Sequence, residues 1–334
     1  MRAAYYERKG PPHEVIKIGD LPTPEPGPGE VRVRIRVSAV NPSDTKQRSG
    51  WGGGMDMPFA RIVPHQDGAG EIDRVGPGVP DSRLGERVWL YEAQRDGRAF
   101  GTAAEYAVVP ATNAVRLPDG ASFDDGASLG VPGMTAHRLL FGAGAVHGKT
   151  VLVAGGAGSV GHMAVQLARW AGAQVIATVG SDGQAEVARA SGAHHVLNYK
   201  TDDVIERIRA ITGADGGVDQ VIEVAFAKNL ALDAAVLKPS GTIATYMIDE
   251  DLARSPTLNL QQLLVKEIAV RFTLVYAMPP EAHKMAARDL NAALAAGALK
   301  PRIARRFQLG EIADAHELLG TPGMGGKAVI DIGT

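Results

Sequence analysis

The segment that most constrains the fold of this chain is a short apolar strand that leads directly into a glycine-rich turn. The strand VLVA is followed by GGAGSVG, which places Gly156, Gly158 and Gly161 at the spacing G-x-G-x-x-G before an apolar helical stretch. Glycines at these positions permit a tight turn, close approach of the backbone to a pyrophosphate, and close packing of helix on strand. The start of the helix offers unpaired N–H groups to phosphate. We therefore expect dinucleotide binding here, rather than a loop without a ligand. The expected contacts also include Ala157, Ser159 and Val160.

Strand-like and helix-like runs alternate around this turn. Apolar runs such as TVLVAGG, QVIATVG and VDQVIEVA are separated by amphipathic helical stretches. Continuous apolar strands between such helices are typical of a parallel sheet covered on both faces. The sequence predicts an α/β, Rossmann-type doubly wound domain over residues 126–269.

The first part of the chain, to residue 125, has a different pattern. It consists of short β-branched runs separated by Gly and Pro, and EVRVRIRVSAV alternates apolar and basic residues with period two. This pattern predicts an antiparallel, β-barrel-like domain. After a strand over 269–276 and a helix over about 280–296, the final strand KAVIDIG indicates that residues 270–334 rejoin this first domain. The nucleotide domain is then an insertion.

The end of the second strand of the nucleotide domain bears on the choice of cofactor. An Asp or Glu there would bind the ribose hydroxyls of NAD, whereas the strand ends with Thr178, Val179, Gly180 and Ser181. Small neutral residues leave room for a 2′-phosphate, to which Ser181 can donate. Asp182 lies close by, and we interpret it as a helix N-cap rather than a ribose ligand. We expect NADPH.

Composition excludes several classes of protein. The chain has no cysteine, so disulfides, thiolate nucleophiles and cysteine zinc sites are excluded. Lys plus Arg number 35 against 37 Asp plus Glu, which gives no electrostatic reason to expect nucleic acid or an anionic membrane. The charged N-terminus is unlike a secretory signal, and no apolar stretch is long enough to span a membrane. We expect a cytoplasmic protein with a small-molecule partner.

Several motifs in order along the chain resemble the medium-chain dehydrogenase/reductases, and within them the zeta-crystallin-like quinone oxidoreductases. The resemblance covers nearly the whole chain and implies a Rossmann domain inserted in a GroES-like domain. It is carried by AVNPSDTKQRSG (39–50), HQDGAGEIDRVGPGV (65–79), GERV (85–88), AEYAVVP (104–110), ASLGVPGMTAHRLL (127–140), AGGAGSVG (154–161), GAHHVLNY (192–199) and AHELLGTPGMGGKAVI (315–330).

Zinc-dependent members of this family bind the metal through Cys and a Gly-His-Glu segment, and this chain has neither. Asn41 stands where the Cys would be, Gln66 where the His would be, and Asp67 replaces the Glu. Neutral amides are poor zinc ligands beside thiolate and imidazole. We expect no metal, and we interpret His65 as structural.

The resemblance also implies roles for individual residues. Asn41 and Asp44 would face the nicotinamide, although Asp44 also suits turn chemistry in its Pro-containing loop. Thr135 would contact the nicotinamide ring, Tyr199 would pack at the 2′-phosphate end, and Lys327 would reach the cofactor. Each has a local alternative: a helix-start hydroxyl, a strand-end aromatic and a solvated charge. The remaining expected cofactor contacts are the strand ends at Val224, Ala225 and Met247.

Two positions depart from the family pattern. Lys46 stands where many quinone oxidoreductases have Tyr, and Gln184 stands where many carry the Lys or Arg that holds the extra phosphate. If Lys46 points inward, it would stabilise an oxyanion that forms on the acceptor.

The resemblance implies NADPH-dependent reduction of quinones by a homodimer that pairs through RFTLVYAM (271–278). The alternatives are an enone, alkenal or enoyl reductase that acts on activated C=C bonds, and an NADPH-binding regulatory or structural protein without turnover.

Overall fold

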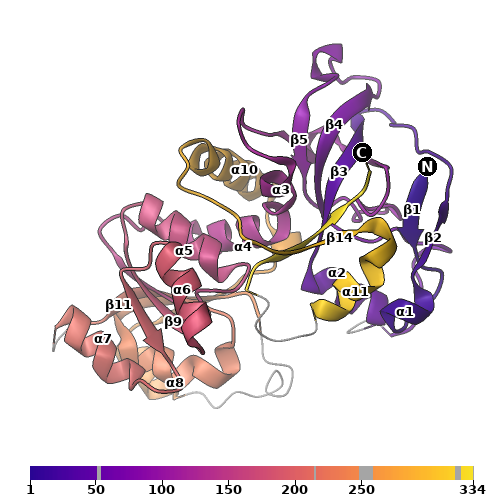
Figure 1. The fold of residues 1–334 in the computed structure, drawn as a ribbon. Helices are drawn as coiled ribbons and strands as arrows, with labels where there is room; N and C mark the ends of the chain where they lie inside the picture. The colour runs from indigo at the N-terminus through magenta and orange to yellow at the C-terminus, as the bar shows by residue number, and fades with distance from the viewer. Residues whose placement is uncertain (51–53, 214–215, 248–258, 320–324, 334) are drawn as a thin grey trace. The chain divides into compact units, whose positions relative to one another are not determined.

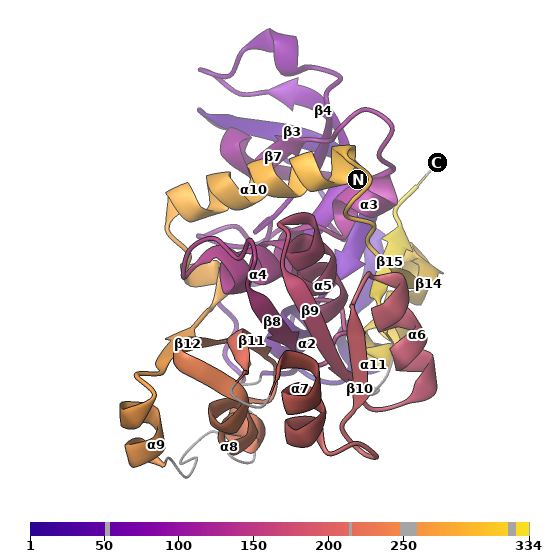
Figure 2. The same ribbon diagram turned by 90° about the vertical axis from the view of Figure 1, so that its left-hand side faces the viewer.

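The computed structural model describes residues 1–50, 54–213, 216–247, 259–319 and 325–333, and the chain forms two compact units. The first unit comprises residues 1–131 and 301–334, and the second comprises residues 132–300. Figures 1 and 2 show their helices and strands, and each unit is described by itself below.

The first unit contains a seven-stranded sheet in the order β14-β15-β3-β4-β5-β7, with β6 paired to β3. Apart from the parallel pair β14 and β15, the strands are antiparallel, as the alternating pattern predicted. A further pair, β1 and β2, lies beside it. The elements are β1 (Arg2–Tyr5), α1 (Pro12–Val15), β2 (Lys17–Asp20), β3 (Glu30–Val40), α2 (Pro42–Ser49), β4 (Asp67–Val75), η1 (Asp81–Arg83), β5 (Arg87–Leu90), β6 (Tyr106–Pro110), η2 (Ala111–Asn113), β7 (Ala114–Arg116), α3 (Phe123–Ala127), β14 (Ile303–Gln308), η4 (Leu309–Glu311), α11 (Ile312–Leu318) and β15 (Lys327–Asp331).

The second unit contains a parallel six-stranded sheet in the order β10-β9-β8-β11-β12-β13. Its strands consist mainly of buried Val, Ile, Leu and Ala, as the continuous apolar runs predicted. The elements are α4 (Gly130–Phe141, which begins two residues before the unit boundary), β8 (Thr150–Val153), α5 (Gly161–Trp170), β9 (Gln174–Val179), α6 (Asp182–Ala190), β10 (His195–Asn198), α7 (Val204–Thr212), β11 (Val218–Glu223), α8 (Phe226–Val236), β12 (Leu237–Thr245), α9 (Leu260–Val265), β13 (Ala269–Phe272), η3 (Val275–Ala277) and α10 (Pro280–Ala295).

The strand order reverses between β8 and β11, which makes this the switch point of a doubly wound sheet. Helices α5 and α6 contact each other and strands β8, β9 and β10, whereas α7 and α8 form a second contacting pair (Figure 2). Because right-handed crossovers run in opposite directions from the switch point, the two pairs cover opposite faces of the sheet. A ligand is expected at the carboxyl ends of the strands there.

The position of residues 270–300 corrects one boundary expected from the sequence. These residues belong to the second unit and not to the first, because β13 pairs in parallel with β12 through Thr242–Ala269 to Thr245–Phe272. The strand expected over 269–276 also ends early, at Phe272.

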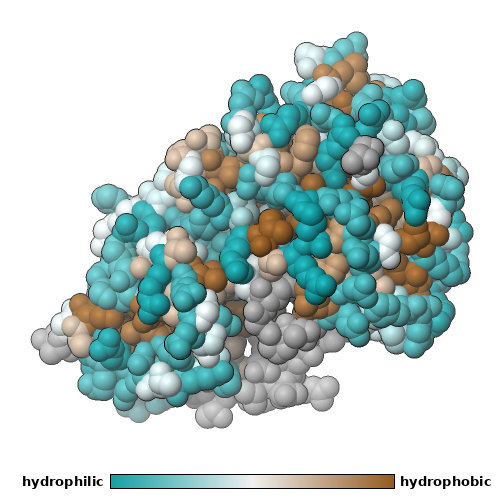
Figure 3. All heavy atoms as spheres, in the orientation of Figure 1, coloured by the Kyte–Doolittle hydropathy of each residue, from teal (hydrophilic) through white to brown (hydrophobic). Residues whose placement is uncertain are grey.

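Hydrophilic and hydrophobic residues are interspersed over the face of the molecule in Figure 3. No helix within the described residues is long and apolar enough to cross a membrane.

Candidate functional site

The glycine-rich turn has the geometry that its spacing predicted. Strand β8 ends at Val153, the turn follows, and α5 begins at Gly161. A Cβ on Gly156 would stand 2.7 Å from the Cβ of Ala177, and a Cβ on Gly161 would stand 2.1 Å from the carbonyl oxygen of Gly155. Both positions therefore require glycine so that the helix can lie close to the strands.

A pocket of about 680 Å³ lies at the carboxyl ends of five strands of the second unit. This is the place at which doubly wound sheets bind nucleotides, beside the switch point between β8 and β11. The lining includes Ala154, Gly155, Ala157 and Gly158 after β8, Thr178, Val179, Gly180 and Gln184 at β9 and α6, Tyr199, Asp202 and Asp203 after β10, Glu223, Val224, Ala225, Lys228, Asn229 and Asp233 at β11 and α8, and Tyr246 after β12.

The predicted cofactor residues fall into two groups. Ala157, Gly158, Gln184, Tyr199, Val224 and Ala225 line this pocket. The other predicted residues of the second unit do not line it: Gly156, Ser159, Val160, Gly161, Ser181 and Met247. The roles of Gly156 and Gly161 in packing account for their spacing.

The end of β9 shows which residue caps α6. Ser181 is the N-cap, and its Oγ accepts a hydrogen bond from the N–H of Gln184 at 3.4 Å. The interpretation of Asp182 as the cap was wrong, because the helix begins at Asp182 itself. The side-chain Oε1 of Gln184 accepts from the N–H of Gly180 at 2.8 Å. A Cβ on Gly180 would stand 2.5 Å from the Oη of Tyr199, so this glycine makes room for the tyrosine.

Two buried carboxyl groups in the pocket wall were not predicted. Glu223 is 0% exposed and Asp233 is 1% exposed. Oε1 of Glu223 accepts from the N–H groups of Val224, at 2.8 Å, and Ala225, and from Nδ2 of Asn229 at 3.1 Å. Burial raises the pKa of both carboxyls, and the charge of Glu223 raises the pKa of Asp233 further, which favours one shared proton between them. Glu223 fixes the turn between β11 and α8, on which the two predicted cofactor contacts Val224 and Ala225 lie.

The first unit contains a buried cluster of Asn41, Asp67 and Lys327. Lys327, 2% exposed, donates from Nζ to Oδ1 of Asn41 and, at 3.2 Å, to Oδ2 of Asp67. Nδ2 of Asn41 donates to the same Asp67 oxygen at 2.8 Å, and the N–H of Val131 donates to both Asp67 oxygens. Strands β15 and β4 and the start of α2 hold the three side chains. The ammonium of Lys327 is thus engaged inside the unit, and its predicted contact with the cofactor stays a prediction.

This cluster does not suit zinc. Zinc sites in proteins need thiolate, imidazole or carboxylate donors that converge on one open point. Here the carboxylate of Asp67 already binds an ammonium and an amide, and Nε2 of Gln66 donates to the carbonyl of Gln94 at 2.9 Å. The ammonium of Lys327 therefore already supplies the positive charge beside Asp67.

Asp44 and Lys46 lie on α2, a helix that the sequence did not predict because PSDTKQRS is polar throughout. Oδ2 of Asp44 accepts from the backbone N–H of Asn41 at 2.7 Å, which is the local structural role left open for it. Burial and the neighbouring Asp67 raise the pKa of Asp44 to about 7, so this carboxyl can hold a proton at neutral pH. Lys46 is half-buried on the same helix, and Thr135 is buried within α4.

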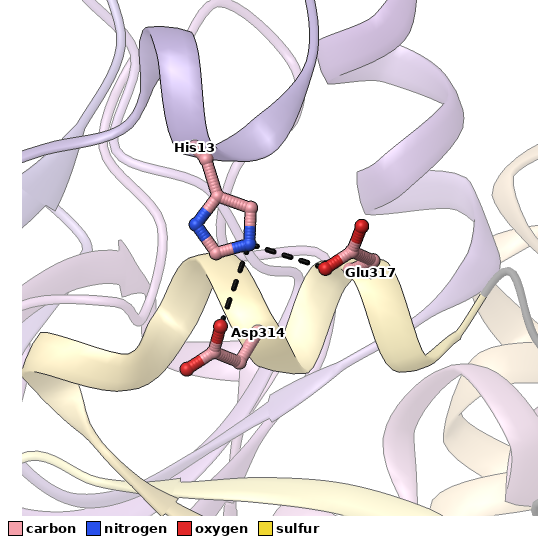
Figure 4. Close-up of side chains that lie close together, drawn as sticks. All are labelled: His13, Asp314 and Glu317. Carbon is pink, nitrogen blue, oxygen red and sulfur yellow. Dashed lines mark hydrogen bonds and ion pairs between the residues drawn. The ribbon is translucent and has the colours of Figure 1, made fainter.

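A third group of side chains lies at the surface of the first unit (Figure 4). Nε2 of His13, from α1, is 3.4 Å from Oδ1 of Asp314 and 3.2 Å from Oε2 of Glu317, both from α11. The three side chains are between 53% and 70% exposed, and surface ion pairs account for their arrangement. We interpret them as a link between the two helices.

Two family models match the chain. The model of the alcohol dehydrogenase GroES-like domain matches residues 27–119, and the model of the zinc-binding dehydrogenases matches residues 159–291.

Similar curated proteins cover nearly the whole chain. A quinone oxidoreductase of Rattus norvegicus is 33% identical over 329 residues, which are 97% of this chain and 95% of that protein. A 2-haloacrylate reductase of a Burkholderia species is 34% identical over 334 residues, covering 96% and 95% of the two chains.

Solved structures of similar proteins share the fold. An NAD-dependent alcohol dehydrogenase has a TM-score of 0.87 at 27% identity, with 100% of both chains covered. An Escherichia coli quinone oxidoreductase complexed with NADPH has a TM-score of 0.83 at 25% identity, with 99% of this chain and 100% of that chain covered.

Proposed function

Because this chain belongs to the medium-chain dehydrogenase/reductase family, we propose that it is a zinc-independent, NADPH-dependent reductase of quinones. The observation that carries the proposal is the pocket at the switch point of the parallel sheet, which adjoins the glycine-rich turn and is of a size for a dinucleotide. A bound nicotinamide cofactor would supply a hydride. Membership of this family identifies the chain as an oxidoreductase. The choice of NADPH, the independence from zinc and the choice of a quinone as acceptor are supported by separate observations.

The preference for NADPH is supported by the residues at the end of β9. No Asp or Glu ends this strand, and Gly180, Ser181 and the amide of Gln184 are neutral. Asp202 and Asp203, which also line the pocket, are already engaged as acceptors for the N–H groups of Asn198 and Glu206. The NADPH complex of the similar Escherichia coli enzyme is consistent with this choice.

Zinc independence is supported by the cluster of Asn41, Asp67 and Lys327, in which an ammonium provides the positive charge. Reduction of a quinone needs no Lewis acid, because the acceptor is already electron-poor. The chain then has to hold the two reacting groups in contact, and Thr135 on α4 and Lys46 on α2 are the side chains that we assign to the nicotinamide and to the developing oxyanion.

Reduction of an activated C=C bond is a second candidate. The similar protein named 2-haloacrylate reductase favours it, at 34% identity beside 33% for the quinone oxidoreductase of Rattus norvegicus. Both reactions use the same hydride donor and differ only in the acceptor.

The decisive experiment measures oxidation of NADPH and of NADH with 1,4-benzoquinone and with an alkenal, in chelator-treated protein. We expect turnover of benzoquinone with NADPH that chelation leaves intact. Turnover of the alkenal alone would select the second candidate. Tight NADPH binding without oxidation by either acceptor would indicate a regulatory or structural protein.

We also propose a homodimer formed through β13. This strand is the last in the sheet order, and Phe272 and Leu274 on and after it are 67% and 59% exposed. An apolar sheet edge of this kind favours pairing with a second copy. Light scattering should give twice the mass of the chain, and Phe272→Lys should give a monomer.

A further inference from the structure

A second pocket of the second unit, separate from the cofactor pocket, has an unusual charge. It has a volume of about 350 Å³ and lies between α4, the end of β12, and the segment from β13 to the start of α10. Its described lining consists of Arg138, Thr245, Tyr246, Met247, Arg271, Phe272, Thr273, Leu274, Ala277, Met278 and Pro279. Two arginines thus share a small pocket in whose described lining there is no Asp or Glu.

Neither guanidinium is engaged by the part of the protein that the structure describes. Across the described ranges, Arg138 and Arg271 make no hydrogen bond and no ion pair through their side chains. By contrast, Arg32, Arg36, Arg83 and Arg306 each bind a carboxylate. Two half-buried guanidinium groups that repel each other are stabilised when an anion binds between them. Their planar donors suit a carboxylate, which can accept two hydrogen bonds from each.

The two arginines reach this pocket from different elements. Arg138 lies on α4, and Arg271 lies on β13 beside Ala244 of β12. Nη2 of Arg271 is 3.4 Å from the point where a Cβ on Gly142 would stand, which is ordinary contact distance, so this guanidinium lies against the end of α4. The arginine of the strand therefore extends toward the helix that carries the other arginine.

The pocket adjoins the proposed site of reaction. Arg138 is three residues after Thr135 on α4, so the two side chains lie on the same face of the helix. Tyr246 lines this pocket and the cofactor pocket alike. The rest of the lining is largely apolar. It includes Met278, together with Phe272 and Leu274, which also form the sheet edge of the proposed homodimer. A small molecule with an apolar body and one negative group fits this environment.

We propose that Arg138 and Arg271 bind the carboxylate of the acceptor, so that the substrate is a small, electron-poor molecule with a carboxylate group. This inference rests on the proposed reductase activity and names the substrate class for it. Hydride addition to a double bond conjugated with a carboxylate places negative charge on the acceptor. The two guanidinium groups stabilise this charge.

The test compares 2-chloroacrylate with its uncharged methyl ester, because both contain the same activated double bond. In wild-type protein we expect kcat/KM to be higher for the carboxylate than for the ester. Arg138→Gln and Arg271→Gln should each lower this ratio about tenfold, the loss of one charged hydrogen bond. Arg138→Lys should restore part of it. Arg288→Gln, which removes a charge from the exposed surface of α10, should leave the ratio unchanged.

A binding measurement makes the test independent of turnover. Calorimetry should give a Kd for 2-chloroacrylate, in the presence of NADP⁺, that rises about tenfold in each glutamine variant. An unchanged ratio and an unchanged Kd in both variants would overturn the inference. If no acceptor is reduced by any form of the protein, the proposed function fails, and the Kd values still decide whether the arginines bind a carboxylate.

Discussion

His65 and His316 meet through their Nε2 atoms, 2.9 Å apart, in the interior of the first unit. They are 0% and 2% exposed, and their rings stack with centroids 5.1 Å apart. Nε of Arg48 donates to Nδ1 of His316 at 3.3 Å, and a guanidinium can only donate. His316 is therefore protonated at Nε2 and donates to His65.

The same direction continues beyond His65. Because Nε2 of His65 accepts, this neutral ring carries its own proton on Nδ1 and donates it to Oγ of Ser38 at 2.8 Å. Ser38 then donates to Thr102 at 2.7 Å, and Thr102 donates to the carbonyl of Asp67 at 2.6 Å. Each of these donors has an acceptor only while both imidazoles are neutral.

Stability of the chain should consequently fall in mild acid. Burial lowers the pKa of His316 to about 3 and that of His65 well below its usual value. The unfolded chain takes up protons near pH 6.5 that the folded chain cannot hold, so the free energy of unfolding decreases as pH falls below about 6.5. The slope is about 1.4 kcal/mol per pH unit for each histidine. Urea titrations between pH 8 and pH 5 measure it.

His316→Phe provides the control for this prediction. The variant should be less stable at pH 8, because Arg48 and His65 lose a partner, but its stability should depend less on pH between 7 and 5. An acid slope equal to that of the wild type would show that other groups cause it.

Replacing Lys327 by Met should destabilise the first unit strongly. The change leaves the carboxylate of Asp67, which is 0% exposed, without its positive partner, and this costs about 3–5 kcal/mol. Adding Asp67→Asn should recover part of the loss, because the uncompensated charge is then removed. The coupling is measured by urea unfolding of the two single variants and the double variant at pH 7. Strictly additive losses would contradict the pairing.

These two networks show what the sequence could and could not predict. The glycine-rich turn was predictable because a few neighbouring residues determine it: Gly156 and Gly161 are required by close contacts with Ala177 and Gly155. The strands followed from runs of apolar residues. By contrast, Lys327 and Asn41 are 286 positions apart, and nothing local to either indicates that they meet.

The carboxyl pair in the cofactor pocket was missed for a related reason. Glu223 ends a strand and Asp233 lies in the following helix. Neither position by itself predicts a buried pair of carboxyl groups. Only the packing of α8 back against β11 brings the two buried carboxyls together. A buried Asp in an otherwise apolar helix, NLALDAAVLK, was the available signal.

Replacing Asp233 by Asn should stabilise the protein at alkaline pH. The folded pair keeps a proton above the pH at which an unfolded Asp, with a pKa near 4, loses it. The contribution of this carboxyl pair to stability therefore falls as pH rises above about 4, whereas an amide at position 233 donates to Glu223 without ionising. The variant should be more stable by about 1 kcal/mol at pH 8 and should approach the wild type near pH 4. Urea titrations at both values check this, with exposed Asp182→Asn as control, and lower stability of the variant at pH 8 would contradict it.

Replacing Gln184 by Lys should strengthen the preference for NADPH over NADH. Residue 184 lies in the first turn of α6 and lines the cofactor pocket, and its Oε1 accepts from the N–H of Gly180. The substitution removes this hydrogen bond, which affects both cofactors, and adds a cation that only a 2′-phosphate can use. The ratio of the two Kd values, measured by cofactor fluorescence, should therefore shift about tenfold toward NADPH. Gln184→Met removes the same hydrogen bond without adding charge and should weaken both cofactors alike. If the lysine variant also leaves the ratio unchanged, the 2′-phosphate does not lie beside α6, and the basis for NADPH at the end of β9 is lost.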